Sequence, residues 1–349
     1  MKKNNKKIFT LDKFIDFALY DKDNGYYVKK NPFGKKGDFI TSPNISILFT
    51  EMIAIWIISL WEFLGRPKEF NVVELGAGNG EMAKDLIKTF ERFPNFKNSY
   101  KLNIFEKSKS LIELQKKKLK LYKVKWIKNL EDVSDIPTIF IANEFFDALP
   151  IKQFLKTNDI WYEKKIECRD NGLKPKFFEE RVNVSKIKKK LGLDIFLNQN
   201  FVEFSPSLFE YLKIISKKIT LNDGGILIID YGNWEKKMRD TLKSFSKHKP
   251  NNLFENIGKS DITYDINFQS LKKILNSFDL KINGSSTQKS FLLNMGILER
   301  AEIISKNLTF SKKADIYYRL KKLIDKKEMG EIFKVLFASN SKNKFNIGF

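Results

Sequence analysis

The chain has 349 residues, of which 42% are hydrophobic and 14% aromatic, so its composition is that of a globular protein. Its formal net charge is +22, but only seven of the 64 basic residues are arginine. Proteins that read nucleic acids favour the planar fork of arginine, so we expect a solvated lysine surface and no specific nucleic-acid binding. One cysteine, Cys168, and one histidine, His248, exclude intramolecular disulfides, thiolate clusters and histidine-rich sites, and no metal is expected.

The N-terminal residues 1–7 are basic, and no signal-peptide-like apolar segment follows them. The longest apolar run, residues 52–61, is about half the length of a membrane span. We therefore expect no membrane insertion and predict a cytoplasmic location.

Residues 1–69 precede the first predicted core strand and form an N-terminal cap with a binding loop. Residues 31–43 are rich in glycine, proline and hydroxyl side chains, which is typical of a surface connector or of a binding loop. Ser42 and Pro43 predict a helix start, with serine as the N-cap. The helix that follows, 44–63, is apolar nearly all round, so we expect it to be buried.

A glycine turn follows the first predicted strand, Phe70–Leu75. Gly76, Gly78 and Gly80 stand at alternate positions, and the next residues have helical spacing. Glycine is needed where the backbone takes positive φ or passes against a ligand. The dinucleotide-binding fingerprint needs its third glycine at position 81, which is Glu81 here, so the turn favours S-adenosylmethionine. A tight structural turn without a ligand is the alternative.

The next strands are predicted at 101–106, 124–127, 138–142 and 226–230, in alternation with helices, as in a parallel sheet. Glu106 ends the second strand, about 25 residues after the turn, where an acid can accept both ribose hydroxyls of an adenosine. A surface acid paired with a lysine is the alternative. The strand at 138–142 continues into Asn143-Glu-Phe-Phe-Asp-Ala-Leu-Pro150.

The alternation stops at 151–204, which we interpret as an inserted element of short antiparallel strands with one basic helix. We assign 70–150 and 205–300 to the cofactor-binding core, with a long polar connection at 233–266 and the last two strands at 280–282 and 290–293. Residues 301–349 are predicted to be a helical tail.

These features together resemble class I S-adenosylmethionine-dependent methyltransferases, which are α/β proteins with a Rossmann-like, mostly parallel seven-stranded sheet. More specific segments are similar to motifs of the MidA-like family, which includes the mitochondrial methyltransferase needed for respiratory complex I assembly. These segments, found between residues 9 and 305, are Tyr26-Tyr27, Pro32-Phe-Gly, Gly37-Asp-Phe-Ile-Thr-Ser-Pro43, the octapeptide at 143–150, Ile229-Asp-Tyr-Gly232 and 287–297.

The resemblance implies S-adenosyl-L-methionine as cofactor and a protein-arginine methyltransferase as activity. The implied acceptor is the 49-kDa-type, quinone-pocket subunit of NADH:quinone oxidoreductase. The sequence leaves the oligomeric state open, with a homodimer as one candidate. The loop 37–43 would close over the methionine end of the cofactor. The family usually has Glu after Ser-Pro, where this chain has Asn44, which affects the expected acceptor specificity. The residues expected at the cofactor are Gly37, Asp38, Thr41, Ser42, Glu74, Gly76, Gly78, Gly80, Glu106 and Asn143.

Methyl transfer mainly needs alignment of acceptor, methyl and sulfur, without a metal or covalent nucleophile. Two carboxylates can orient a cationic guanidinium, and Glu144 and Asp147 are the candidate catalytic pair. The alternative is a helix start, with Asn143 as N-cap and both acids in its first turn. The aromatic side chains Phe145, Phe146 and Tyr231 line the site or pack the core.

His248 is a surface histidine or a base, and Cys168 has no assigned chemistry. Three functions remain from the sequence: a protein-arginine methyltransferase, a methyltransferase for a small molecule or nucleic acid, and an assembly factor that binds cofactor with little turnover. The large cap and inserted element favour a bulky acceptor. The absence of an Asn-Pro-Pro-aromatic motif after the strand at 138–142 argues against base methylation.

Overall fold

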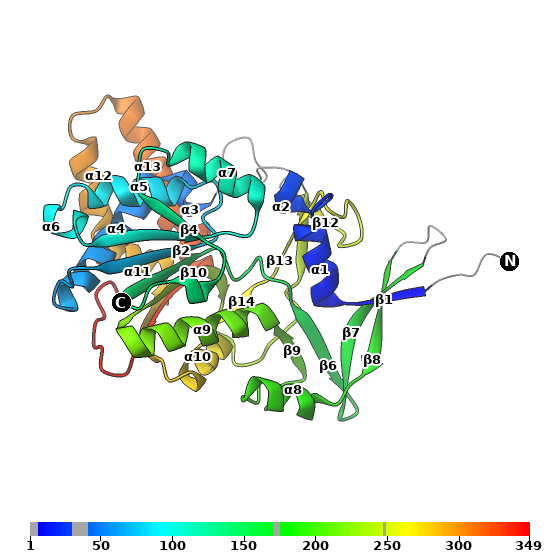
Figure 1. Cartoon of the computed structure of the whole chain (residues 1–349). Helices are drawn as coiled ribbons and strands as arrows, with labels where there is room; N and C mark the ends of the chain where they lie inside the picture. Colours follow the sequence, from blue (N-terminus) through cyan, green and yellow to red (C-terminus); the bar gives the residue numbers. More distant parts are fainter. Residues whose placement is uncertain (1–5, 30–40, 170–174, 247–248) are drawn as a thin grey trace.

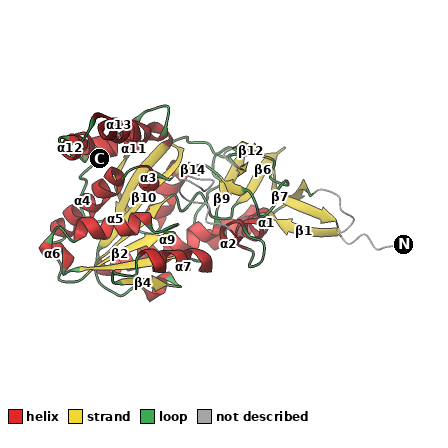
Figure 2. Ribbon diagram, turned by 90° about the horizontal axis from the view of Figure 1, so that it is seen from above, coloured by secondary structure: helices red, strands yellow, loops and turns green. Residues whose placement is uncertain are grey.

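A mostly parallel sheet forms the centre of the protein (Figures 1 and 2). The structure is a computed structural model, and it describes residues 6–29, 41–169, 175–246 and 249–349. The sheet has the order β15-β16-β10-β5-β2-β3-β4, with the short β14 paired to β10. Its strands are β2 (Phe70–Leu75), β3 (Tyr100–Phe105), β4 (Val124–Ile127), β5 (Thr138–Asn143), β10 (Gly224–Asn233), β14 (Ile266–Asn267), β15 (Lys281–Thr287) and β16 (Phe333–Ser339).

The strands β4, β3, β2, β5 and β10 are parallel, and only β16 runs antiparallel to both its neighbours. The expected Rossmann-like, mostly parallel sheet is therefore confirmed. Every residue of β2 and β5 is buried. Such continuous apolar strands need cover on both faces. Helices supply that cover: α4 (Ile47–Phe63), α5 (Glu81–Phe90), α12 (Ile297–Ser305) and α13 (Phe310–Ile324) contribute to one apolar cluster, and α9 (Pro206–Asn222) and α10 (Phe268–Ser277) to the other.

The helix expected at 44–63 is divided in two. A first turn, α3 (Ser42–Ile45), ends where Ser46 takes extended backbone angles, and the hydroxyl of Ser46 then accepts a hydrogen bond from Leu48 N at the start of α4. The N-cap of α3 is Thr41, so Ser42 lies inside the helix instead of capping it. As expected, α4 is buried along most of its length. No helix of the described residues is long and apolar enough to cross a bilayer.

The last strands differ from the prediction. Residues 290–293 lie in a helix, α11 (Gln288–Asn294), and the strand β16 lies in the segment expected to be a helical tail. All of Phe333–Ser339 is buried, because β16 is inserted between β10 and β15. Periodicity does not separate a short buried strand from a buried helix, which explains the error. The other helices of this tail are α12, α13 and α14 (Met329–Ile332).

A second, antiparallel sheet stands beside the core (Figure 1). It has the order β1-β7-β6-β9 with β8 paired to β7, and its N-terminal strand β1 comes from the segment expected to be a cap. The sheet consists of β1 (Lys6–Thr10), β6 (Lys152–Thr157), β7 (Ile160–Arg169), β8 (Lys176–Arg181) and β9 (Phe201–Phe204), with the helix α8 (Val184–Leu191). The hairpin turn between β6 and β7 has positive φ at Asn158 and Asp159, as a type I′ turn requires.

Two further groups of elements connect this sheet to the core. The helices α1 (Leu11–Tyr20) and α2 (Tyr26–Lys29) follow β1, and α2 packs against α7 (Lys109–Lys118). The polar connection at 233–266 contains a three-stranded sheet of β11 (Lys243–Ser246), β12 (Lys249–Asn251) and β13 (Asp261–Thr263). Residues from both groups reach the carboxyl ends of the core strands.

Candidate functional site

A cavity of about 640 Å³ lies at the carboxyl ends of β2, β3, β5 and β10. This edge is where open α/β sheets bind their ligands, and the volume suits a small-molecule cofactor. The lining residues come from the core, from α1, and from the three-stranded sheet. Those used below are Tyr20, Tyr27, Thr41, Gly76, Gly78, Glu106, Lys107, Glu144, Phe145, Asp147, Tyr211, Tyr231, Lys243, Phe245, Asp261, Thr263 and Asp265.

The glycine turn forms part of the cavity wall. Gly76 and Gly78 line it and have φ of +68° and +51°. A Cβ on Gly76 would lie 2.7 Å from Cδ2 of Phe145, so no other residue fits there without a shift. Gly80 is not in the lining: it is the left-handed N-cap of α5, and a Cβ there would lie 3.3 Å from Cγ of Gln115. The first two glycines therefore face the cavity and the third serves the turn.

Glu106 lines the cavity just after β3. Its Oε1 accepts a hydrogen bond from Ser108 N at 2.9 Å, and its Oε2 accepts one from Gln115 Nε2 at 3.3 Å. Burial raises the pKa of Glu106 above the usual range of a glutamate. Within the described residues Glu106 accepts these hydrogen bonds and forms no ion pair, and its role at a ribose stays a prediction.

Gln115 is a site residue that the sequence analysis missed. Its side chain is fully buried and links two residues of the cavity wall, Gly78 and Glu106, to Trp126 of β4. Its Nε2 donates to Gly78 O at 2.9 Å as well as to Glu106, and its Oε1 accepts from Trp126 Nε1 at 3.0 Å. The signal was present, because Leu111 and Leu119 flank Gln115 at the i ± 4 positions of the buried helix face.

Two residues expected at the cofactor lie behind the wall. Glu74 is buried in β2 and does not line the cavity; its Oε2 has no hydrogen-bond partner, and burial together with the nearby Glu106 raises its pKa to about 8. Asn143 is also outside the lining, with its Oδ1 unpartnered and its Nδ2 3.3 Å from Glu144 Oε1. Both side chains therefore lie one layer behind the cavity surface.

The binding loop is described only from Thr41 onward, so Gly37 and Asp38 lie outside the described residues. Thr41 lines the cavity. Ser42 is fully buried: its N–H donates to Glu144 Oε1 at 3.2 Å, and its hydroxyl donates to Gln288 Oε1 at 3.4 Å. The loop is therefore hydrogen-bonded directly to Glu144, one of the two candidate catalytic acids.

Asn44, which stands where the related family usually has Glu, joins this loop to the glycine turn. Its Nδ2 donates to Thr41 Oγ1 at 2.6 Å, and its Oδ1 accepts from Asn79 Nδ2 at 2.9 Å. Asn79 Oδ1 in turn accepts a hydrogen bond from Glu81 N, at the start of α5. Asn44 therefore has a structural role in holding the loop over the turn.

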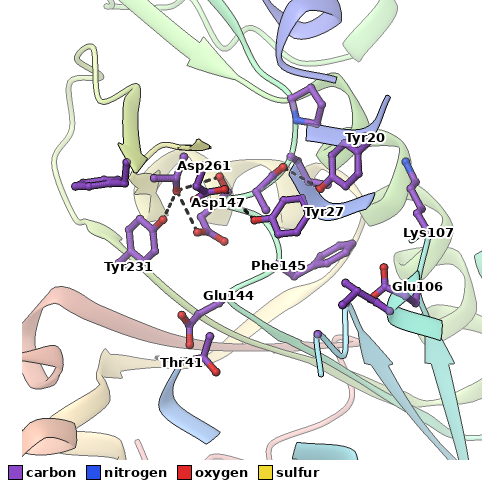
Figure 3. Close-up of a pocket in the computed structure, with 18 of the residues that line it drawn as sticks. Tyr20, Tyr27, Thr41, Glu106, Lys107, Glu144, Phe145, Asp147, Tyr231 and Asp261 are labelled. Carbon is purple, nitrogen blue, oxygen red and sulfur yellow. Dashed lines mark hydrogen bonds between the residues drawn. The ribbon is translucent and has the colours of Figure 1, made fainter. Parts of the chain in front are cut away.

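The segment after β5 is a turn and not a helix, so the helix-start alternative for Glu144 and Asp147 is wrong. A distant residue holds this turn: Oδ2 of the fully buried Asp230 accepts hydrogen bonds from Phe146 N at 3.1 Å and Asp147 N at 3.3 Å. These bonds satisfy two backbone donors of the turn. Glu144 has φ of +50°, and both acids line the cavity (Figure 3).

The three acids form a buried carboxyl cluster without a cation. Burial and the neighbouring Asp147 raise the pKa of Glu144 to about 8, and burial raises that of Asp147 to about 6. The pKa of Asp230 is also raised, by burial and by the two other acids. Within the part of the chain that the structure describes, none of the three has an ion pair, although the chain carries a net charge of +22.

Aromatic and hydroxyl side chains surround this cluster. Figure 3 shows Glu106 and Lys107 on one side of the cavity, Asp147, Tyr231 and Asp261 on the other, and Phe145 between them. The hydroxyls of Tyr231 and Thr263 are hydrogen-bonded to each other, and Thr263 Oγ1 donates to Asp147 Oδ2 at 3.1 Å. Phe146 is fully buried in the core and is not in the lining.

Further lining residues could not be placed from the sequence. Tyr20 and Tyr27 reach the cavity from α1 and α2, and the Tyr27 hydroxyl donates to Asp261 Oδ1 at 3.0 Å. These two partners are 234 positions apart, and no local pattern relates them. Cys168 lies in β7, in the second sheet, where burial raises the pKa of its thiol. His248 lies outside the described residues.

Comparisons with known proteins agree with this arrangement. A family model of S-adenosyl-L-methionine-dependent methyltransferases matches residues 52–286. The chain is similar to protein arginine methyltransferase NDUFAF7, mitochondrial, of Xenopus tropicalis, with 31% identity over 93% of this chain and 81% of that protein. The human protein of the same name is 29% identical, over 93% of this chain and 78% of that protein.

A solved structure has the same fold. It is a COG1565 superfamily member from Burkholderia thailandensis, crystallised with S-adenosyl-homocysteine. The TM-score is 0.81, with 22% sequence identity over 98% of this chain and 90% of that one. The fold of this chain is therefore the class I methyltransferase fold.

The expected cytoplasmic location is contradicted by these comparisons, since the similar curated proteins are mitochondrial. The prediction was wrong because it rested on the cysteine count and on the lengths of apolar runs, which do not separate one reducing compartment from another. The match over residues 52–286, together with the 31% identity to a relative over 93% of the chain, shows that the protein belongs to the MidA-like family of S-adenosyl-L-methionine-dependent methyltransferases.

Proposed function

We propose that this methyltransferase acts on arginine side chains of a protein, with the 49-kDa-type, quinone-pocket subunit of NADH:quinone oxidoreductase as acceptor, in support of complex I assembly. The arginine acceptor is supported by the name of the NDUFAF7 relatives. The particular subunit follows from the family resemblance of the sequence motifs.

The cavity residues fit S-adenosyl-L-methionine. Gly76 and Gly78 offer a wall without side chains at positive φ, and Glu106 offers a carboxylate for ribose hydroxyls at one end. We assign Thr41 and Ser42 to the methionine end, with Gly37 and Asp38 of the same loop as further candidates. Glu74, Gly80 and Asn143 would support the cofactor from behind the wall.

The buried carboxyl cluster is the observation that carries the proposal. Burying ionised carboxyl groups without a cation costs free energy. Such groups are either protonated in the free protein or become ionised when a cationic partner binds. Here they line a cavity in a family of methyltransferases, and an arginine side chain would supply the missing charge. Several described lysines form ion pairs elsewhere, for example Lys152 with Glu163. Of the two lysines in the cavity lining, Lys243 is paired with Asp265, and Lys107 lies on the side of Glu106 (Figure 3).

Bound S-adenosyl-L-methionine supplies a methyl group on a sulfonium, which is already an activated leaving group. In our proposal the Glu144 carboxylate binds the guanidinium and fixes one nitrogen in line with the methyl carbon, while Asp147 supports it from the side. Methylation releases one proton from the acceptor nitrogen, and the adjacent carboxylate of Glu144 or Asp147 would accept it.

The acceptor is expected to be bulky because the cavity is bordered by added elements. We propose that the inserted element 151–204 contacts the acceptor protein. A homodimer, one candidate assembly from the sequence, stays a prediction that light scattering can test.

Mass spectrometry of the quinone-pocket subunit, isolated with and without this protein present, tests the acceptor. The expected result is a methylated arginine that appears only with the protein. Purified protein, subunit and labelled cofactor should reproduce the transfer in a single turnover. Cofactor binding with no transfer to any arginine would instead support an assembly factor with little turnover.

A further inference from the structure

A second cavity, of about 420 Å³, lies between the antiparallel sheet and the three-stranded sheet, and we call it the flanking cavity. It is lined by Lys164, Phe177, Asp240, Leu242, Lys243, Ser244, Phe245, Pro250, Asn251 and Leu253. The first two come from β7 and β8 of the inserted element, and the others from the segment 233–266. Nothing in the methyl-transfer chemistry described above uses this cavity.

The flanking cavity borders the main cavity, because two residues belong to the lining of both. Lys243 and Phe245 line both, and they stand two positions apart on β11 and so on the same face of that strand. Lys243 forms an ion pair of 2.7 Å with Asp265, which lines the main cavity. The rim between the two cavities is therefore a short strand with side chains facing both.

The flanking cavity is apolar in character. Phe177, Leu242, Phe245, Pro250 and Leu253 supply most of its surface.

Its charged residues are all in ion pairs, Lys164 with Asp240 inside the cavity and Lys243 with Asp265 of the main cavity. Lys164 Nζ lies 2.9 Å from Asp240 Oδ2 and 4.3 Å from the ring centroid of Phe177. The lysine charge is thus already balanced by a carboxylate and an aromatic face. Phe177 keeps 37% of its surface exposed although it packs on Phe254 at 4.8 Å between ring centroids.

We propose that the flanking cavity binds an apolar side chain of the acceptor polypeptide, close in sequence to the arginine that enters the main cavity. The proposal rests on the proposed function and adds a specificity determinant to it. An extended chain advances about 3.3 Å per residue, so a polypeptide that crosses the β11 rim places neighbouring side chains in the two cavities. A small metabolite bound in the main cavity would have no second group that could occupy the flanking cavity.

Binding of labelled peptides to the full chain, measured by fluorescence anisotropy with S-adenosyl-homocysteine present, tests this inference without turnover. Each peptide carries one arginine, with a single leucine placed in turn at each flanking position in a glycine–serine background. We expect one or two leucine positions to strengthen binding by roughly tenfold, the scale of one buried apolar side chain. Equal affinity for all peptides, or no binding of any, would overturn the inference.

Two variants place the effect in the cavity. Leu253→Asp and Phe177→Ala should abolish the preference for leucine while leaving the affinity for the all-glycine peptide and for S-adenosyl-homocysteine unchanged. Phe310→Ala is the matched control, because Phe310 is 88% exposed on α13 and belongs to neither cavity. A leucine preference that survives both cavity variants would contradict the assignment.

The two proposals fail separately. Selective binding of a leucine peptide without methyl transfer to its arginine would count against the arginine-methyltransferase function and leave the flanking cavity in place. Methyl transfer to every arginine peptide, with no effect of the flanking residue on KM, would leave the function and overturn the cavity inference.

Discussion

The backbone N–H of Ser42 donates a hydrogen bond to Glu144 Oε1 over 3.2 Å, although the two residues are 102 positions apart. The bond joins the N-terminal binding loop to the segment after β5. Glu144 also has φ of +50°, which is uncommon for a residue other than glycine. Loop and acid thus position each other, and a change in the loop is expected to alter the acid as well as the cofactor site.

Glu144→Gln keeps the side-chain volume and one acceptor oxygen but removes the charge that a cationic acceptor needs. We expect cofactor affinity to stay nearly unchanged and methyl transfer to an arginine-containing acceptor to fall by roughly 10²-fold or more, the scale of a lost charged contact. Single-turnover transfer of labelled methyl at saturating cofactor measures this. Glu113→Gln, an exposed change on α7, is the control.

A wild-type rate in Glu144→Gln would show that this carboxyl does not orient the acceptor. Loss of cofactor binding in the same variant would place Glu144 at the amino group of the cofactor instead, and Asp147 would then be the remaining candidate for the acceptor.

Gly78→Val should abolish binding of S-adenosyl-L-methionine, because its side chain would project from the wall of the main cavity. The substitution also strains the backbone, since Gly78 has positive φ. Gly65→Val carries the same strain at φ of +82° but meets no atom within 4 Å, so it is a matched control. Calorimetric titration of both variants separates strain from occlusion, and unchanged affinity in a folded Gly78→Val would contradict the glycine-turn assignment.

Glu106→Ala should weaken the cofactor by about 1.5–3 kcal/mol, the range of hydrogen bonds to a charged group. Gln115→Leu keeps the helix face buried but removes the donor to Glu106 and to Gly78 O, so we expect a smaller loss of affinity in the same direction. Calorimetry measures both. A loss of less than a few tenths of a kcal/mol in Glu106→Ala would place this acid outside the cofactor contacts.

Glu74→Gln should change how stability depends on pH. The pKa of Glu74 is raised from 4.5 to about 8, so its neutral form is favoured in the folded protein. The stability that this group contributes is therefore fully present below about pH 4.5 and is lost as pH rises through about 8. Thermal unfolding of the cofactor-free protein should show a Tm that falls more steeply between pH 5 and pH 9 in the wild type than in Glu74→Gln. Parallel pH profiles would show that Glu74 is not the titrating group.

Much of the core could be predicted from local sequence. The strands β2 and β4 have the predicted limits, and β3 and β5 differ from the prediction by one residue, because each is a short, largely apolar run with glycine or polar residues after it. Parallel strands also end at one edge of the sheet. The sequence therefore placed Glu106, Glu144 and Asp147 at one edge, and all three line the same cavity.

Tertiary structure decided the features that depend on distant partners. The segment Phe333–Ser339 forms the antiparallel strand β16, which pairs with β10 on one side and with β15 on the other. The periodicity of the segment itself does not predict this pairing. The turn at residues 144–147 is held by Asp230, which accepts from the N–H groups of Phe146 and Asp147, 84 and 83 positions away. The pattern of neighbouring residues reflects only interactions between residues that are close in sequence. A hydrogen bond between residues far apart in sequence forms only after the fold has brought them together.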